Sequence, residues 1–343
     1  MSKGRTDKCK SHGAKTRRLP PADPMSLEKD LAKMPSPWSS SSQPASVIHR
    51  VLRAVTGGFA AFLLGLNVLV VFLAMTPMAL LKLTISTPMV RRVCNRLLNA
   101  LADLWVCFNN AWIVLVGNRP VLTDALPALQ RKGSYLVICN HQSWVDIFVL
   151  QRVFFRRIPL LKFFLKRELL YVPVIGLAWW ALDFPFLRRQ SDAKGMENDL
   201  RASRRACERF KDLPISLVSF IEGTRFSRDK HTAQRSPYQH LLKPKLGAFG
   251  MSVATLGDRV DLMIDVTIAY PNGVPSLWDL LSGNVEGVQV FVRTMEIPET
   301  LSDPAFIGKR EWHVALGRWI QSLWREKDET LAKVVEAQGA GAK

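Results

Sequence analysis

The chain has 343 residues, of which 48% are hydrophobic, so it can build one sizeable core domain with additional elements. It carries 47 Lys and Arg against 29 Asp and Glu, a formal net charge of +18, which suits contact with polyanions such as nucleic acid or anionic lipid headgroups. Its five cysteines are odd in number and none are at metal-ligand spacing, which argues against a disulfide scaffold or a zinc ribbon. Reduced thiols and a working face in the cytosol are expected.

The N-terminal third divides into a polar tail and a long apolar stretch. Residues 1–46 mix basic residues with Pro and Ser and predict a disordered basic tail, not a signal peptide. Between Arg53 and Lys82 no charged residue occurs, and about 20 apolar residues suffice to span a bilayer. Both flanks are basic, so charge does not set an orientation. We expect a membrane helix over 47–110, or a monotopic helix pair with residues 88–110 as its amphipathic second member.

The remaining chain alternates between apolar strand candidates and helical stretches. The strand candidates are 112–117, 134–139, 214–221, 262–270 and 288–295, and the helical stretches are 192–211, 245–256 and 308–336. This alternation predicts an α/β domain over 111–336, with a mixed, mostly parallel sheet flanked by helices. Residues 337–343 are expected to form a disordered C-terminus.

The segment 159–187 is rich in aromatic and aliphatic residues, but Lys162 and Lys166 lie within it and Pro173 and Pro185 interrupt it. These charges and breaks argue against a second span. A hydrophobic layer that rests on a membrane, or that lines an acyl-chain groove, fits the composition better.

The motif NHQSWVD (140–146) directly follows a predicted strand, which places His141 where α/β folds keep their sites. Ser143 can cap the next helix, and Asp146 can complete a capping box that brings its carboxylate back toward His141. An imidazole can take a proton from an alcohol at neutral pH, and a carboxylate on its other nitrogen fixes the tautomer. The alternative interpretation is a plain helix cap beside an ordinary histidine.

The motif FIEGTR (220–225) follows another predicted strand. Gly223 lets the backbone turn sharply and expose its N–H groups, and Thr224 adds a hydroxyl donor. Arg225 offers a planar fork for phosphate oxygens, and Glu222 can orient that arginine or hold a substrate hydroxyl. The motif therefore predicts a small anion site, although a simple polar turn has the same composition.

Further basic residues gather near both motifs and strengthen the case for an anionic ligand. They are Arg188, Arg189, Lys230, Lys243 and Lys245. His231 and His240 have no Asp, Glu or Cys at useful spacing, so no metal site is expected.

Taken together, NHxxxxD, F-L-x-R (186–189) and EGTR, in this order after a hydrophobic helix, resemble the glycerolipid acyltransferase family. Its best-known members are the 1-acylglycerol-3-phosphate (lysophosphatidic acid) acyltransferases, the PlsC-like enzymes. Residues 134–295 carry the resemblance. The stretches FIEGTRFSRDKH, LLKPKLGAF and DVTIAYP look like the branch that holds the bacterial inner-membrane enzymes of YihG type and some eukaryotic lysophospholipid acyltransferases.

The resemblance implies that His141 is the general base and Asp146 its partner. It implies that the acceptor's phosphate and glycerol are bound by Glu222, Gly223, Thr224, Arg225 and Arg189. The donor would be acyl-CoA as a co-substrate, with no cofactor, and the fold would be an α/β domain with an N-terminal membrane-associated helical element. The implied location is a membrane, the bacterial inner membrane, with the active site facing the cytoplasm.

Two departures from the family pattern bear on the acceptor's identity. The second block usually starts with glycine, and Asp183 stands in that place here. The fourth block often has an early proline, whereas DVTIAYP has its proline only at Pro271.

These observations lead to a direct transfer of a fatty acyl group to a lysophospholipid hydroxyl, with 1-acylglycerol-3-phosphate as the expected acceptor and phosphatidic acid as the product. Alternatives are another lysophospholipid acceptor, a thioesterase, or a non-catalytic anionic-lipid-binding membrane protein. Basic runs with few interleaved aromatic residues argue against nucleic acid as a partner. The oligomeric state stays open.

Overall fold

The computed structural model describes residues 46–85, 87–118, 121–122, 126–172, 175–187, 214–285, 287–303 and 305–341. The predicted tail up to residue 45 and the predicted helix 192–211 lie outside these ranges.

The centre of the fold is a six-stranded sheet with the order β1-β8-β7-β2-β6-β3. The strands are β1 (Val121–Leu122), β2 (Tyr135–Cys139), β3 (Leu161–Phe163), β6 (Ser216–Phe220), β7 (Leu262–Ala269) and β8 (Gln289–Met295). Only the β7–β8 pairing in this sheet is antiparallel. Strands β4 (Leu165–Lys166) and β5 (Phe186–Leu187) form a separate parallel pair. The predicted mixed, mostly parallel sheet is confirmed.

The register of the central strands brings three loops to one edge. Cys139, the last residue of β2, lies opposite Phe220 in β6 and Val266 in β7. All three strands run parallel, so their carboxyl ends point the same way. This is the edge at which open α/β sheets place ligands, and both sequence motifs begin there.

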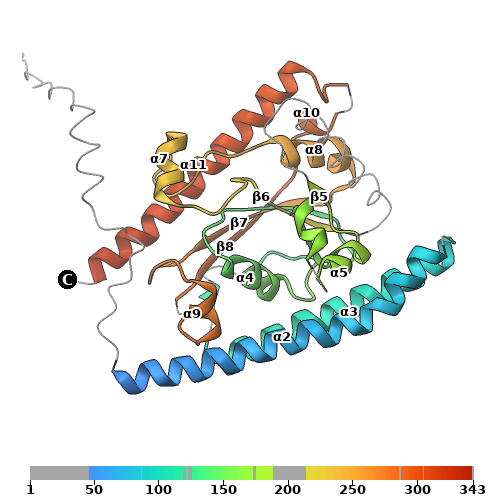
Figure 1. Ribbon diagram of the computed structural model, residues 1–343. Coiled ribbons are helices and arrows are strands. Elements are labelled where there is room, and N and C mark those ends of the chain that lie inside the picture. Colours follow the sequence, from blue (N-terminus) through green and yellow to red (C-terminus); the bar gives the residue numbers. More distant parts are fainter. Residues whose placement is uncertain are drawn as a thin grey trace, which may run out of the picture.

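Helices cover both faces of the sheet (Figure 1). One side holds α4 (Val145–Phe154), α5 (Ile175–Ala181) and α9 (Leu277–Leu281), and the other holds α8 (Gly247–Leu256), α10 (Glu299–Ser302) and α11 (Arg310–Gly341). The described residues of the domain also include helix α7 (Arg228–Gln234) and short 3₁₀ turns at Arg167–Tyr171 and Gly257–Arg259. Side chains of β2 alternate between the two cores: Val137 faces the α4 side, and Leu136 and Ile138 face the α11 side.

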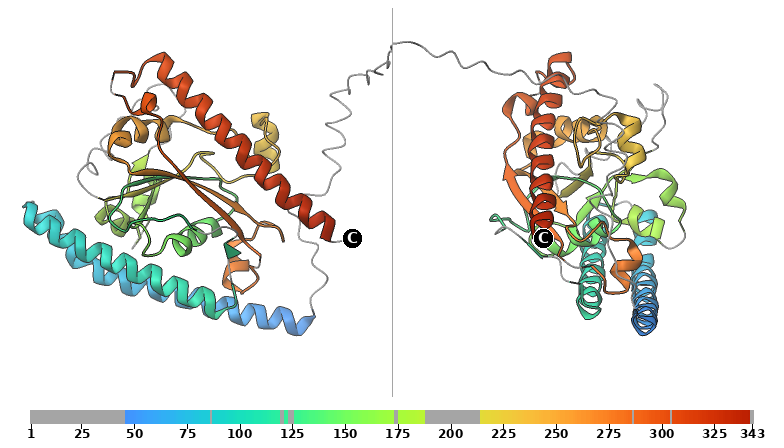
Figure 2. Two further views of the ribbon diagram at one scale, coloured as in Figure 1. Left: turned by 180° about the vertical axis from the view of Figure 1, so that it is seen from behind. Right: turned by 90° about the vertical axis from the view of Figure 1, so that its left-hand side faces the viewer.

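Two long helices, α2 (Val47–Thr84) and α3 (Pro88–Leu115), lie side by side along the α4 side of the domain (Figure 2). Ser46 caps α2 by accepting from His49 N, and Thr87 caps α3 by accepting from Val90 N. Both helices are long and apolar enough to cross a membrane. By length and composition, the helix pair matches the membrane-associated helical element that the sequence predicts.

The predicted strand 112–117 is wrong, because α3 continues through Leu115. Its buried positions recur every three or four residues up to this point: Leu98, Ala102, Val106, Asn109 and Ile113. This helical spacing carries the apolar run to its end, whereas a short run read alone fits a strand equally well. The α/β domain therefore begins after the helix, not at residue 111.

Two other expectations change. The C-terminal helix α11 extends to Gly341, so most of the predicted disordered stretch 337–343 is helical. The segment 159–187 holds β3, β4, α5 and β5, and α5 packs against α2 instead of presenting a free hydrophobic layer. Strand β3 was missed because its three residues are too few to show an alternating pattern.

Candidate active site

The end of β2 is anchored to β7 just before the first motif. Asn140 Nδ2 donates to Ile268 O over 2.8 Å, and Ile268 N donates to Asn140 Oδ1 over 2.9 Å. Both residues are fully buried. The Asn140 amide thus extends the hydrogen bonding between β2 and β7 by one residue. This fixes the point at which the chain leaves the sheet, directly before His141.

His141 and Asp146 lie in direct contact. Nδ1–H of His141 donates to Asp146 Oδ2 over 2.8 Å, and the same oxygen accepts from Gln142 N (2.7 Å) and Ser143 N (2.9 Å). A carboxylate oxygen holding these donors is an acceptor, so the imidazole proton sits on Nδ1 and Nε2 keeps its lone pair. Asp146 is completely buried, whereas the His141 side chain is 14% exposed. The geometry provides a base that can be reached from solvent.

The predicted capping box is only half formed. Asp146 does reach back to Ser143 N, but helix α4 has Trp144 at its N-cap position with no side-chain cap. Ser143 Oγ instead accepts from Val145 N and donates to Pro275 O. Ser143 is thus used to tie the motif to the loop after β7, and the carboxylate remains available to His141.

The loops of the two motifs are bonded directly to each other. Phe226 N donates to His141 O over 2.7 Å, and His141 N donates to Glu222 Oε1 over 2.9 Å. The imidazole also stacks on Phe220, with ring centroids 4.0 Å apart. The proton-accepting group and the Glu-Gly-Thr-Arg turn therefore share one small region of the sheet edge.

Glu222 was expected to bind the acceptor, but its side chain lies buried between two loops. Its side chain is 0% exposed, and its second oxygen accepts from Leu242 N over 3.0 Å. Burial raises the pKa of this carboxyl to about 8, against the opposing effect of the two backbone N–H donors. In this structure Glu222 joins the His141 loop to the loop at 242, and each of its two oxygens accepts from a backbone N–H group.

The exposed part of the second motif is an electropositive turn. Gly223 adopts φ +71°, and an added Cβ there would lie 3.1 Å from Cδ of Lys245. Lys230 Nζ donates to Thr224 Oγ1 (2.9 Å) and to Arg225 O (3.0 Å). The turn therefore has Arg225 within it and Lys230 and Lys245 beside it, a composition suited to phosphate oxygens.

Arg225 is held by the first motif. Its guanidinium carbon lies 5.0 Å from the ring centroid of Trp144, in cation–π contact. Trp144 is 50% exposed although it is a large aromatic residue. Sequence reasoning missed this partner, because nothing in the sequence shows that residues 144 and 225 meet.

One further predicted site residue, Arg189, lies outside the described residues, and so does Arg188.

Tyr270 was also missed by the sequence reasoning. Its hydroxyl donates to Asp146 Oδ1 over 2.5 Å, and both side chains are buried. Its place in DVTIAYP, directly after a strand next to β2, is the signal that could have identified it.

Cys139 lies two residues before His141 and carries a thiol, but it is fully buried. Burial raises the pKa of its thiol well above the usual range, so the thiol stays protonated.

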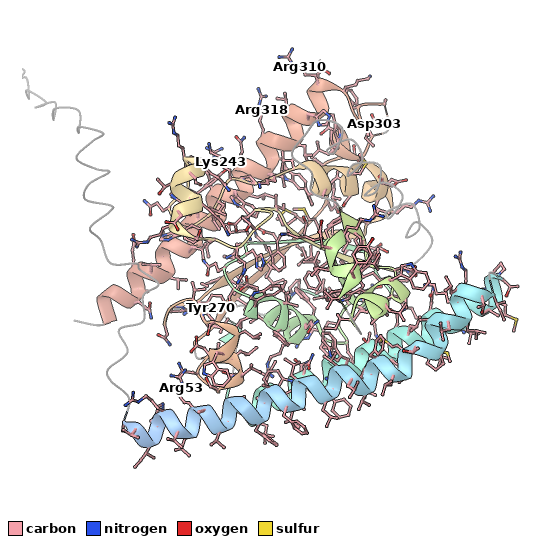
Figure 3. All side chains as sticks on the ribbon, in the orientation of Figure 1. Arg53, Lys243, Tyr270, Asp303, Arg310 and Arg318 are labelled. Atoms are coloured by element: carbon pink, nitrogen blue, oxygen red, sulfur yellow. The ribbon has the colours of Figure 1, made fainter. Side chains whose placement is uncertain are left out.

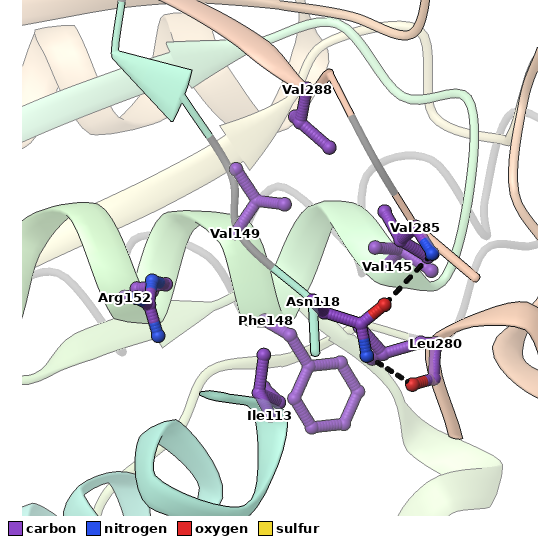
Figure 4. Close-up of a pocket in the computed structure, with 9 residues that line it drawn as sticks. All are labelled: Ile113, Asn118, Val145, Phe148, Val149, Arg152, Leu280, Val285 and Val288. Atoms are coloured by element: carbon purple, nitrogen blue, oxygen red, sulfur yellow. Dashed lines mark hydrogen bonds between the residues drawn. The ribbon is translucent and has the colours of Figure 1, made fainter. Parts of the chain in front are cut away.

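A pocket on another face of α4 is lined by residues of α3, α4 and α9, with Asn118 bonded across it to Leu280 O and Val285 N (Figure 4). Neither motif's polar side chains line that pocket.

A family model matches the part of the chain that contains this site. Residues 123–270, which hold both motifs and Tyr270, match the family model described as Acyltransferase. This segment is therefore similar to the domains that the Acyltransferase family model describes.

Curated proteins similar to this chain are 1-acyl-sn-glycerol-3-phosphate acyltransferases. The form numbered 3 from Arabidopsis thaliana is 29% identical over 68% of this chain and 60% of its own length. The delta form from Mus musculus is 26% identical over 57% of this chain and 52% of its own length. The chain thus spans between half and three fifths of these relatives.

Among solved structures, this chain is similar to the 1-acyl-sn-glycerophosphate (LPA) acyltransferase PlsC from Thermotoga maritima. The likeness has a TM-score of 0.47 and 14% sequence identity, and it covers 82% of this chain and 98% of that one.

Proposed function

We propose that this protein transfers a fatty acyl group from a thioester, acyl-CoA, to the free hydroxyl of 1-acylglycerol-3-phosphate, giving phosphatidic acid. One observation carries the proposal. A partly exposed imidazole paired with a buried carboxylate lies in a loop that is bonded directly to an electropositive Gly-Thr-Arg turn. An acceptor with a phosphate and a hydroxyl a few atoms apart can engage both.

The reaction proceeds without a covalent enzyme intermediate. The acceptor's phosphate binds at Thr224 and Arg225, and its hydroxyl lies at His141 Nε2. The imidazole takes the hydroxyl proton while the oxygen attacks the thioester carbonyl carbon, and Asp146 stabilises the imidazolium that forms. Collapse of the tetrahedral intermediate breaks the carbon–sulfur bond, and the imidazolium returns its proton to the thiolate. The products are an ester and a free thiol.

The helix pair supplies the membrane contact that a lipid acceptor requires. Helix α2 carries a long row of exposed apolar side chains, including Val51, Phe59, Phe62, Leu66 and Leu73. Each of these five is more than two fifths exposed. The relatives' names, the basic composition and this apolar row together support a protein that works on a phospholipid membrane.

The proposal is tested by supplying purified protein with labelled acyl-CoA and a panel of acceptors. Lysophosphatidic acid, lysophosphatidylcholine, lysophosphatidylglycerol and glycerol 3-phosphate are compared, with a water-only control. Transfer to lysophosphatidic acid above the others supports the proposal. Preference for another lysolipid changes the acceptor, and CoA release without any acceptor indicates a thioesterase.

The Gly-Thr-Arg turn is tested with Arg225→Gln and a matched control, Arg318→Gln. Arg318 lies on the exposed face of α11, away from the site (Figure 3). We expect Arg225→Gln to raise the KM for lysophosphatidic acid by about tenfold, since a charge-assisted hydrogen bond contributes roughly 1.5–3 kcal/mol. Arg318→Gln should leave KM unchanged. Equal effects of the two variants would show that only the overall charge matters.

If the purified protein binds anionic vesicles but transfers no acyl group to any acceptor, the non-catalytic lipid-binding alternative is supported.

A further inference from the structure

Asp146 accepts a hydrogen bond that neither motif explains. It comes from Tyr270, the first residue after β7, whose hydroxyl donates to Oδ1 over 2.5 Å. Strand β7 is parallel to β2 and directly beside it, so residues following the two strands meet at the same edge. Tyr270 lies close to this edge, between the sheet and α9 (Figure 3).

The two carboxylate oxygens of Asp146 have separate tasks. Oδ2 accepts from His141 Nδ1 and from the backbone N–H groups of Gln142 and Ser143, while Oδ1 accepts from Tyr270. A carboxylate held at both oxygens cannot turn about its Cβ–Cγ bond. Since Tyr270 and Asp146 are both at most 1% exposed, water does not compete for these bonds.

We propose that Tyr270 is a positioning residue for acyl transfer. Its hydroxyl fixes the plane of the Asp146 carboxylate, which aims Oδ2 at His141 Nδ1, and it draws negative charge away from the imidazole. The chain Tyr270–Asp146–His141 then controls both the direction and the basicity of Nε2. This inference rests on the proposed function for its rate measurements, but not for its titration measurement.

The phenol of Tyr270 is protonated at neutral pH and can therefore donate a hydrogen bond. Burial and the neighbouring Asp146 raise the pKa of its phenol well above the usual range. Other titratable groups also act on this cluster from the surrounding elements: Cys139 in β2, Glu222 after β6, Asp265 in β7 and Lys327 in α11.

The test is Tyr270→Phe, which removes the hydroxyl and keeps the ring. We expect kcat to fall by about tenfold, with the KM for the acceptor changed by less than about twofold, because the lost bond orients the base and does not touch substrate. Without the donor, Asp146 stabilises the imidazolium more strongly. The acid limb of the pH–rate profile should therefore move to higher pH.

A matched control is Tyr135→Phe. Tyr135 lies at the opposite end of β2, is 2% exposed, and its hydroxyl accepts from Gln130 N over 2.8 Å. Its loss should lower stability without moving the pH–rate profile. In an Asp146→Asn background, Tyr270→Phe should cause little further loss of rate, since the two residues act through one path.

An activity-independent measurement follows the His141 ring by NMR in selectively labelled protein, with His141→Ala for assignment. The titration midpoint of His141 should be higher in Tyr270→Phe than in wild type. An unmoved midpoint, an unmoved pH–rate profile, or an undiminished effect of Tyr270→Phe in the Asp146→Asn background overturns the proposal. If the midpoint moves but the wild type transfers no acyl group, the proposed function fails and the hydrogen-bonded chain stands.

Discussion

Glu222 shows how far a residue's role can differ from the role suggested by its motif. In the sequence it belongs to a polar turn, where a carboxylate beside Thr and Arg suggests ligand contact. In the structure it is enclosed, with one oxygen bonded to His141 N and the other to Leu242 N. It therefore acts as a buried brace between two loops.

A pH dependence of stability follows from Glu222. Its folded pKa of about 8 lies above its ordinary value of 4.5. Between these values the folded protein holds a proton that the unfolded chain has released, so the free energy of unfolding falls as pH rises through this window. Glu222→Gln cannot titrate and should lack this part of the decline. Urea unfolding at several pH values from 5 to 8 measures the difference, and parallel curves for the two proteins would contradict it.

Contacts between residues that lie close together in the sequence could be predicted, whereas contacts between distant residues could not. The pairing of His141 with Asp146 could be predicted because five residues and a strand-to-helix corner determine it. The contacts Tyr270–Asp146 and Trp144–Arg225 join residues 124 and 81 positions apart, and only the sheet order brings them together. Local patterns carry no information about such pairs.

Helices α2 and α9 meet at a glycine. Gly57 lies under the ring of Trp278, and an added Cβ would be only 2.7 Å from Cη2 of that ring. The next residue, Gly58, has nothing within 4 Å of the same position. These neighbours form a matched pair for testing how α2 docks on the domain.

Both glycines gain about 1 kcal/mol of helix propensity when changed to alanine. Gly58→Ala should realise this gain, whereas Gly57→Ala displaces Trp278 and should be less stable than Gly58→Ala by roughly 1–3 kcal/mol, the usual cost of overpacking. Thermal unfolding in detergent gives the comparison, and hydrogen exchange in α9 should rise only in Gly57→Ala. Identical behaviour of the two variants would mean that the contact with Trp278 does not hold α2.

The departure at Asp183 also has an explanation at the element scale. Asp183 adopts φ +59°, a conformation that favours glycine, and its carboxylate bonds Lys82 of α2 over 2.6 Å. Lys82 also donates to Ala181 O, and its side chain is 7% exposed. An ion pair to the helix pair thus accompanies the residue that replaces the family's usual glycine.

Asp183→Gly keeps the backbone conformation but leaves a buried ammonium without its carboxylate. We expect a loss of about 2 kcal/mol in the free energy of unfolding. The double variant Lys82→Met with Asp183→Gly should recover most of this loss, because no charge remains buried. Chemical unfolding of the three proteins measures both steps, and a double variant as unstable as Asp183→Gly would contradict the explanation.

At this scale the sequence was a good guide to the long elements and a poor one to the short ones. The alternation in 262–270 and 288–295 is long enough to identify β7 and β8. The run 112–117 has no such pattern, because it is the last turn of a helix whose burial is set by α4 and the domain behind it.

On the scale of the whole molecule, the helix pair lies along the domain. Arg53 pairs with Asp279 near one end of α2, and Lys82 pairs with Asp183 near the other. These contacts are about 44 Å apart at a rise of about 1.5 Å per residue, longer than a hydrocarbon core of about 30 Å. A spanning α2 would carry one of them to the far side. The monotopic alternative expected from the sequence, with the pair in one leaflet, keeps both contacts on the same side.

This arrangement predicts that both ends of α2 stay on the side of the domain. In a variant without native cysteines, His49→Cys and Thr84→Cys are added separately, with Arg318→Cys as a reference for free access. Protein bound to the outside of preformed vesicles is treated with a membrane-impermeant maleimide. All three should react to the same extent, and protection of Thr84→Cys until detergent is added would indicate a spanning hairpin.

The most direct test of the proposed mechanism is a single-turnover measurement of acyl transfer to lysophosphatidic acid by wild type, His141→Ala and Asp146→Asn. If His141 is the general base, His141→Ala loses the chemical step, Asp146→Asn slows it by a factor on the order of 10²–10⁴, and both variants retain most of their lysolipid binding. Turnover at the wild-type rate by His141→Ala would contradict it.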